Sequence, residues 1–386
     1  MGKQILILFL MSTFGLLQAQ VTIPFAKGIA DKKEVKLSEV ASEIRYIPLE
    51  TTAESLLGQE ILDVTIAGGY LFVCDYKKLL QFTPEGKFVR QIGKAGQGPG
   101  EYTESILGVT YNESLKEIYL SDPRQLKLHV YSFAGTFLHD INMEGREYVR
   151  LQDKGCFYAV YNDFLYDKQK RGKEMVVYDG NGKELYNFRF RPKEGVRYPG
   201  INFTLPVIYA YQDAIYYKNP LELEINRIEK KKRKPVYKLD LRDLEKLNHE
   251  EDGKLVIDKE KQVGGYQPNE IAKKKIYFQD IFELDLNMGI YYVQEDERRF
   301  AWYDKQNGKV CRVRALQADM DGFTDDLEGG CPVLPEFLRN GKLVGVVPAP
   351  VLQEKAKPAN AKGSLKKVME NLLEDDNQVI QVVTLK

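Results

Sequence analysis

One strand pattern occurs twice between Ile61 and Met143. Each copy has a short apolar strand, an apolar strand ending in aspartate, a third strand ending in an aromatic residue, a glycine turn and a fourth strand. The aspartates (Asp75, Asp122) and the turn glycines (Gly86, Gly135) recur after roughly 45–50 residues, which is the period of a four-stranded propeller blade. No helical periodicity interrupts the two copies. The duplication therefore predicts a ring of blades.

The remaining sequence repeats this unit less regularly. Apolar runs separated by turn residues place a third blade at 148–190, a fourth at 207–241 and a fifth from Ile276 onward. The boundaries of a sixth blade stay open. Residues 242–275 break the period because they are highly charged, have few β-forming residues and carry two leucines at helical spacing. We expect them to form a partly helical insertion between blades four and five.

An unplaced strand near the start of the chain offers a way to close the ring. Residues 43–50 (EIRYIPLE) alternate apolar and polar side chains, but they precede the first blade. The sixth blade is short of strands, and residues 377–386 (NQVIQVVTLK) form a clear final strand. Pairing these two strands would remove exposed edges. The predicted fold is all-β: a single six-bladed β-propeller domain over residues 20–386, built of four-stranded blades and closed by an N-terminal strand.

The first nineteen residues have the pattern of a signal peptide. Lys3 precedes an apolar run from Ile5 to Leu17, and Ala19 offers a small residue for cleavage. The run is short for a membrane span, although an uncleaved anchor is the alternative. No cysteine follows the run, so a lipid anchor is not expected. We therefore expect a periplasmic or secreted protein without a transmembrane segment in the mature chain.

Four cysteines remain for an oxidising compartment. Cys74 and Cys156 lie in apolar strand patterns, where free cysteine behaves as a small core residue. Cys311 and Cys331 are the more plausible disulfide pair, but the sequence leaves their pairing open. Because no two cysteines have CxxC spacing, neither a zinc site nor a thiol redox site is expected.

Charge and histidine content limit the classes of partner and cofactor. The 56 lysines and arginines balance 56 acidic residues, which argues against nucleic acid or an anionic membrane as partner. The basic run at 230–234 fits a solvated hairpin tip of blade four. The three histidines, His129, His139 and His249, fall in different predicted elements and are not expected to converge on a metal. We expect no cofactor and no metal.

An acidic run near the predicted boundary of blades five and six leaves a second metal hypothesis open. Asp319, Asp321, Asp325 and Asp326 are similar to part of a calcium-binding loop. The complete ligand spacing and the closing glutamate of such a loop are absent. A polar loop between two blades explains the run equally well.

Two sequence segments in the first 143 residues carry a family resemblance. The segments are IPLET at Ile47–Thr51 and GQGPGEY at Gly96–Tyr102. With the strand ending in Asp75 and the final NQVIQVVTLK, they resemble the exported six-bladed β-propeller proteins of Bacteroidetes, which are related to NHL-repeat propellers. The resemblance implies the fold and export. It implies little about activity.

Blade topology predicts where a ligand would bind. In a propeller, the loop between the second and third strands lies on the same face as the crossover to the next blade. Aromatic and charged side chains at a concave mouth suit a polar ligand, such as a glycan or peptide, or a protein partner. The residues expected on this face are Tyr76, Lys94, Glu101, Tyr102, Arg124, Gln125 and Tyr166. Two alternatives remain: solvated loop residues, or a structural role in which Glu101 or Tyr102 holds the next blade.

The sequence contains none of the short catalytic motifs GxSxG and HExxH. This absence favours an exported, non-catalytic binding or scaffold propeller. The alternative is a propeller lyase or hydrolase that acts on glycans at the channel mouth, because function is not determined by this fold. The identity of the ligand and the oligomeric state stay open.

Overall fold

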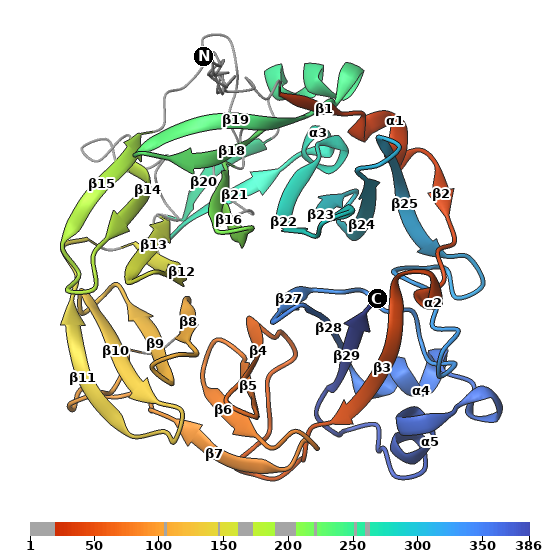
Figure 1. The fold of residues 1–386 in the computed structure, drawn as a ribbon, viewed down its shortest axis with the longest axis horizontal. Helices are drawn as coiled ribbons and strands as arrows, with labels where there is room; N and C mark the ends of the chain where they lie inside the picture. Colours follow the sequence, from red (N-terminus) through yellow and green to blue (C-terminus); the bar gives the residue numbers. More distant parts are fainter. Residues whose placement is uncertain are drawn as a thin grey trace, which may run out of the picture.

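The computed structural model describes residues 20–386, except 104–105, 146, 161–172, 190–205, 220–221, 251–252 and 259–262. Within these residues, six antiparallel sheets surround a central axis (Figure 1). The first strand of each blade lies nearest the axis: β4, β8, β12, β16, β22 and β27. The predicted six-bladed propeller is confirmed.

The sequence duplication corresponds to the first two blades. Each is a four-stranded sheet in chain order from the axis outward, so every neighbouring pair is a simple antiparallel hairpin. Blade one contains β4 (Asp63–Ala67), β5 (Tyr70–Cys74), β6 (Leu79–Phe82) and β7 (Phe88–Ile92). Blade two contains β8 (Val109–Asn112), β9 (Glu117–Asp122), β10 (Lys127–Ser132) and β11 (Phe137–Asn142).

Blades three to five repeat this order. Blade three contains β12 (Tyr148–Asp153), β13 (Cys156–Val160), β14 (Lys173–Tyr178) and β15 (Glu184–Arg189). Blade four contains β16 (Val207–Tyr211), β17 (Ala214–Lys218), β18 (Glu224–Glu229) and β19 (Lys232–Leu239). Blade five contains β22 (Tyr277–Glu283), β23 (Asn287–Gln294), β24 (Glu297–Asp304) and β25 (Lys309–Ala315), with β26 (Met320–Asp321) beside β25.

Blade six joins the two ends of the chain, as predicted. Its strands are β27 (Phe337–Arg339), β28 (Lys342–Val347), β29 (Val379–Leu385) and the N-terminal β3 (Ala41–Pro48). In the antiparallel pair of β29 with β3, Val379 lies opposite Pro48 and Val383 opposite Ile44. Two short helices between β28 and β29, α4 (Ala349–Lys355) and α5 (Gly363–Met369), lie on the outer side of this blade (Figure 1).

The segment before β3 follows the outer rim of the ring (Figure 1). Its elements are β1 (Val21–Ile23), α1 (Phe25–Ile29), β2 (Lys32–Lys33) and α2 (Leu37–Val40). β1 pairs in parallel with β19 and β2 pairs in parallel with β25. The ring of Phe25 is fully buried, with ring centroids 5.1 Å from Phe278 and 5.2 Å from Tyr292. Residues before β3 therefore contribute to the core of blade five.

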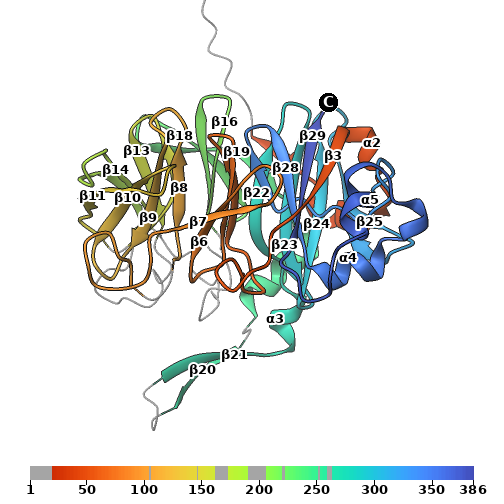
Figure 2. The same ribbon diagram turned by 90° about the horizontal axis from the view of Figure 1, so that it is seen from below.

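The insertion between blades four and five is partly helical, as predicted, but it also contains a β-hairpin that the sequence did not predict. A 3₁₀ helix (Arg242–His249) and α3 (Glu270–Lys274) flank β20 (Gly253–Asp258) and β21 (Val263–Pro268). The hairpin stands away from one face of the ring (Figure 2). Its strands pair antiparallel, with Gly253 opposite Pro268, but their few β-branched residues left little strand signal in the sequence.

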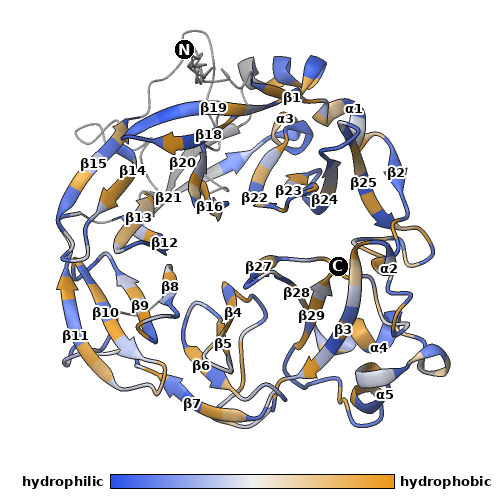
Figure 3. Cartoon of the chain, viewed as in Figure 1, coloured by the Kyte–Doolittle hydropathy of each residue, from blue (hydrophilic) through white to orange (hydrophobic). Residues whose placement is uncertain are grey.

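Apolar side chains fill the spaces between neighbouring blades, while outer strands such as β19 are largely hydrophilic (Figure 3). The four cysteines are free thiols, so the considered Cys311–Cys331 disulfide is not formed. Cys331 is buried in blade six, where its Sγ lies 3.6 Å from the Gln381 amide nitrogen. Cys311 lies on β25 of blade five and is half-buried. Both side chains pack against the same apolar cluster at blades five and six, but their thiols remain free.

Candidate functional site

A cavity of about 520 Å³ lies along the propeller axis. All six inner strands contribute to its wall. The wall extends to Glu113 and to the Asn340–Gly341 turn. These residues lie where the first and second strands of a blade connect, and we call this side the hairpin face. The opposite side, with the connections between blades, is the crossover face.

Some charges in the channel are already paired within the protein. Arg339 on β27 forms an ion pair with Asp63 on β4, and its Nε donates to the Thr65 hydroxyl at 3.1 Å. Thr65 in turn donates to Asp63 at 3.0 Å. This set joins blade six to blade one. At the wall of blade five, buried Glu283 accepts from the Tyr209 and Tyr237 hydroxyls and pairs with Lys305 at 2.8 Å.

Arg150 is different because a β-bulge places it in the channel wall. Val149 pairs with Ala159 and Leu151 pairs with Tyr158, so Arg150 is the extra residue of β12. Bulges redirect side chains and are frequent beside functional sites. The half-buried Arg150 forms no hydrogen bond or ion pair with any residue that the structure describes. Its five N–H donors can therefore serve a ligand.

A second bulge lies in the part of the wall that blade five forms. In β22, Phe278 pairs with Tyr292 and Asp280 with Tyr291, so Gln279 is the extra residue. The Asp280 carboxylate accepts from the Ile281 backbone N–H at 2.8 Å. The Asp280 side chain is solvent-accessible within the channel. Partial desolvation by the surrounding wall nevertheless raises its pKa, although Arg150 and Arg339 oppose the shift by their charge. Asp280 thus lies in the field of Arg150 without forming an ion pair with it.

Glu336 adds a third charged group without a close partner. Burial raises the pKa of its carboxyl group to about 7, and Arg298 only partly offsets that effect. The Arg298 guanidinium lies 4.0 Å from the carboxylate and is itself mostly exposed. An ion pair of this length and exposure contributes little. Glu336 is therefore a poorly compensated carboxyl group in the cavity wall.

Tyr291 lies near both Asp280 and Glu336. Tyr291 lies opposite Asp280 in the β22–β23 pair, and its hydroxyl donates to the carbonyl of Pro335, which precedes Glu336. Burial raises the pKa of Tyr291 well above its ordinary value, and the charges of Glu336 and Asp280 add to this rise. Both carboxyl groups therefore act on Tyr291 at the boundary of blades five and six.

The six predicted residues that the structure describes lie on the crossover face, outside this channel wall. Tyr102 is 2% exposed, and its hydroxyl donates to the Lys77 carbonyl at 2.9 Å. Glu101 accepts from the Gly98 N–H at 2.7 Å and pairs with Lys94 at 3.1 Å. The Gln125 amide donates to the Glu101 carbonyl at 3.0 Å. These bonds hold the crossover to blades one and two.

Asp122 organises the neighbouring loop. Its carboxylate accepts from the backbone N–H groups of Thr103, Arg124 and Gln125. The Arg124 side chain is exposed and Tyr76 is half-buried. Tyr166 lies outside the described residues. The structure thus brings Glu101, Arg124 and Gln125 together, and ligand binding by this face stays a prediction.

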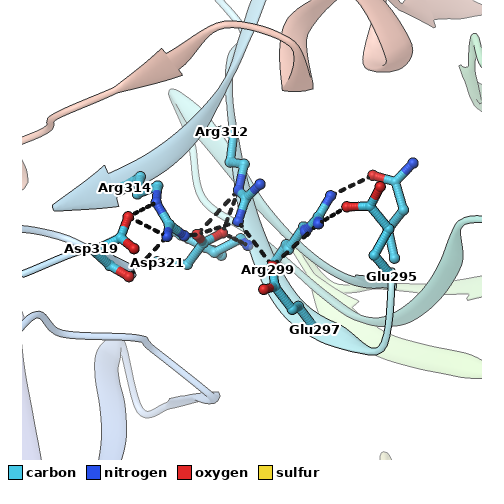
Figure 4. Close-up of polar contacts among 9 residues, drawn as sticks. Glu295, Glu297, Arg299, Arg312, Arg314, Asp319 and Asp321 are labelled. Atoms are coloured by element: carbon cyan, nitrogen blue, oxygen red, sulfur yellow. Dashed lines mark hydrogen bonds and ion pairs between the residues drawn. The ribbon is translucent and has the colours of Figure 1, made fainter. Parts of the chain in front are cut away.

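His129 and the acidic run form hydrogen bonds and ion pairs with protein groups. His129 is buried, with Nδ1 2.7 Å from Asp140 and Nε2 3.6 Å from Asp122. Asp321 accepts from Arg312 and Arg314, and Figure 4 shows this network beside Arg299 and its two glutamates. Arg314 also pairs with Asp319, while Asp325 and Asp326 accept from Tyr46 and Ser38. Within the described residues, no group of three or more potential metal ligands gathers.

The sequence did not single out the charged groups of the channel. The structure assigns Asp63, Arg150, Asp280, Glu336 and Arg339 to the cavity wall. A weak signal was present, because a carboxylate interrupts the apolar run IYFQDIFELD. Strand alternation alone gives no indication of a bulge, since the extra residue shifts the register.

Comparison with known proteins gives a family and a fold. A search of the curated proteins finds no match. Among the described residues, no helix is long and apolar enough to cross a membrane. A Bacteroides fragilis protein described as exported matches with a TM-score of 0.67 and 18% identity, over 95% of this chain and 100% of that chain. A DUF4221 family member from Bacteroides vulgatus matches with a TM-score of 0.51 and 10% identity, over 90% and 97% of the chains. The family model described as "Domain of unknown function (DUF4934)" matches residues 20–384, and the chain belongs to this family.

Proposed function

We propose that this protein is an exported, non-catalytic binding propeller that holds a polar ligand in its central channel. The observation that carries the proposal is Arg150, which a bulge directs into the cavity and which has no partner among the described residues. Withdrawing a charge from water without compensation is costly. A ligand oxygen would supply the missing acceptor.

The cavity has suitable dimensions and chemistry. Its volume of about 520 Å³ falls within the range of small-molecule sites. Thr110, Gln152 and Gln279 contribute polar groups to the wall, so hydroxyl and amide groups of a glycan or peptide would find partners. Export is supported by the signal-peptide pattern of residues 1–19 and by the description of the Bacteroides fragilis relative.

Calorimetric titration of the purified protein tests the proposal. The probes are neutral, acidic and amino trisaccharides and short peptides, and the variants are Arg150→Ala and Arg45→Ala. Arg45 is an exposed arginine on the outer strand β3. Arg45→Ala is therefore a control that removes the same charge far from the channel. We expect Arg150→Ala to weaken the best probe by about tenfold or more, because a charged hydrogen bond is lost. Equal affinity of both variants would contradict binding in the channel.

One observation favours the enzymatic alternative, a glycan hydrolase or lyase. Asp280 and Glu336 are both carboxyl groups of the cavity wall, and desolvation raises the pKa of both. A carboxyl group with a pKa near neutrality is a suitable general acid. Product analysis with the same trisaccharides distinguishes the two functions. If wild type cleaves a trisaccharide and Glu336→Gln does not, the protein is an enzyme. If the bound ligand stays intact, the result supports a binding protein.

A further inference from the structure

We infer that the ligand carries a primary ammonium group, which binds between the carboxylates of Asp280 and Glu336 while a ligand oxygen accepts from Arg150. This inference rests on the proposed function, because it specifies the chemistry of a ligand in the same channel. The relevant class is a small polar molecule with an amine beside an oxygen acceptor. Amino sugars and the N-terminus of a peptide share this chemistry.

The first argument is the charge balance of the wall. Among the described residues that line the cavity, five carry carboxyl groups and two carry guanidinium groups. Asp63 is neutralised by Arg339, and Glu283 by Lys305. Glu113, at the mouth, accepts from the Gly68 N–H at 2.9 Å. Asp280, Glu336 and Arg150 remain, so the inner wall lacks one positive charge whenever both carboxyl groups are ionised.

The second argument is geometric. The Asp280–Tyr291 register and the Tyr291–Pro335 hydrogen bond place Asp280 on β22 and Glu336 directly before β27, the inner strand of the next blade. An ammonium group has three N–H donors and can therefore bond to both carboxylates at once. The bulge at Gln279, next to Asp280, and the bulge at Arg150 belong to blades five and three, on separate parts of the wall. A ligand that spans them needs a donor at one end and an acceptor at the other.

Other ligand classes fit these groups less well. An anion at Arg150 without an accompanying cation would face two carboxylates and would be repelled. A divalent metal requires more ligands than this pair supplies, and no cluster of three potential ligands occurs in the described part of the chain. A neutral sugar would leave the carboxylates without a counter-charge.

The experiment compares ligands that differ in one group. Calorimetry would measure binding of a glucosamine trisaccharide, its fully N-acetylated counterpart, triglycine amide and N-acetyltriglycine amide. Acetylation removes the positive charge while keeping the scaffold. We expect at least one amine probe to bind about tenfold more tightly than its acetylated form. The tighter of the two amine probes identifies the source of the ammonium group.

The same ligand pairs are then compared on protein variants. Asp280→Asn and Glu336→Gln should each remove most of the preference for the amine, whereas Glu113→Gln at the mouth should keep it. Thermal unfolding checks that the variants are folded, and the comparison of ligands remains valid without any variant. Equal binding of acetylated and free probes that still depends on Arg150 would overturn this inference and leave the proposed function standing. Binding that is independent of Arg150, or no binding of any probe, would overturn both.

Discussion

Polar groups are used differently in two parts of this ring: the crossover between blades one and two, residues 93–108, and the central channel. In the crossover, Tyr102 and Glu101 bond to protein groups, and the loop fastens adjacent blades. In the channel, Arg150 has no bonded partner among the described residues, and Glu336 has one distant cation. Satisfied polar networks stabilise a fold, while uncompensated charges in a cavity are available for a ligand.

Glycine in the crossover serves packing in the same way. Gly100 has a φ of 71°, which side-chain-bearing residues rarely adopt, and a Cβ there would collide with the Phe137 ring of blade two. Gly93 lies similarly close to Tyr131. The glycine-rich run is thus a close contact between blades. Substitutions in the crossover and in the channel can therefore test this difference between the two regions.

The largest effect is expected from removing the closure on which both regions depend. Deletion of residues 20–50 removes β1, β2 and β3, and with them the buried side chains of Ile23, Phe25 and Ile44. We expect loss of a single cooperative transition in differential scanning calorimetry, because blades four, five and six lose outer partners. Arg45→Ala, an exposed change in β3, is the control. Unchanged melting of the truncated protein would show that the ring does not need this strand.

The next largest effect is expected at the crossover. Tyr102→Ala should lower the free energy of unfolding by about 3–5 kcal/mol, since a buried aromatic ring is lost. Tyr102→Phe should cost about 1 kcal/mol, because the ring stays and only the hydroxyl's bonds to the Lys77 carbonyl and the Gln91 amide disappear. Urea unfolding measures both. A negligible loss of stability in Tyr102→Ala would contradict the structural role of this residue. It would favour the hypothesis that Tyr102 binds a ligand.

In the channel, removing a charged side chain should raise the free energy of unfolding instead of lowering it. Burial raises the pKa of Glu336 from 4.5 to about 7, so the folded state binds the proton more tightly than the unfolded state. Ionisation above the folded pKa therefore destabilises the protein. Glu336→Gln should raise the free energy of unfolding by about 1–3 kcal/mol at pH 8 and leave it nearly unchanged at pH 4. An equal gain at both pH values would show that the carboxyl charge is not the cause.

Near the crossover, pH should change the stability that His129 contributes through its contacts with Asp122 and Asp140. Burial alone would lower the pKa of His129, but Asp122 and Asp140 outweigh it and raise the pKa above its ordinary value. Lys127, the other charged group facing this set, pairs with Asp140 at 2.8 Å. The contribution of charged His129 is therefore present below its unfolded pKa and lost as pH rises through its folded pKa. The stability difference between wild type and His129→Gln should shrink from pH 6 to pH 9, as measured by urea unfolding.

The fold could be predicted because its signals are periodic. The spacing of Asp75 and Asp122 gave the blade, and the alternation in residues 43–50 gave the closing strand. The β20–β21 hairpin and the rim strands β1 and β2 could not be predicted, because each is short and depends on its partner strand. Propensity has little influence on such segments compared with tertiary pairing.

The candidate site could be predicted only in its general chemistry. Loop residues such as Tyr102 suggested a polar binding face, but burial depends on the distance to blade one, which local sequence does not contain. Arg150 and Asp280 enter the channel through bulges, and one extra residue changes the direction of every later side chain in a strand. The hypothesis of a polar ligand is retained, and its proposed location moves to the axis.

The measurement that tests the central claim most directly compares Arg150→Ala with Arg124→Ala. Each should lower the free energy of unfolding by less than about 1 kcal/mol, because Arg150 lacks a bonded partner among the described residues and the Arg124 side chain is exposed. Calorimetric titration with the glucosamine trisaccharide should then show about tenfold weaker binding for Arg150→Ala and a change below about twofold for Arg124→Ala. The reverse order would place the ligand on the crossover face and contradict binding in the channel.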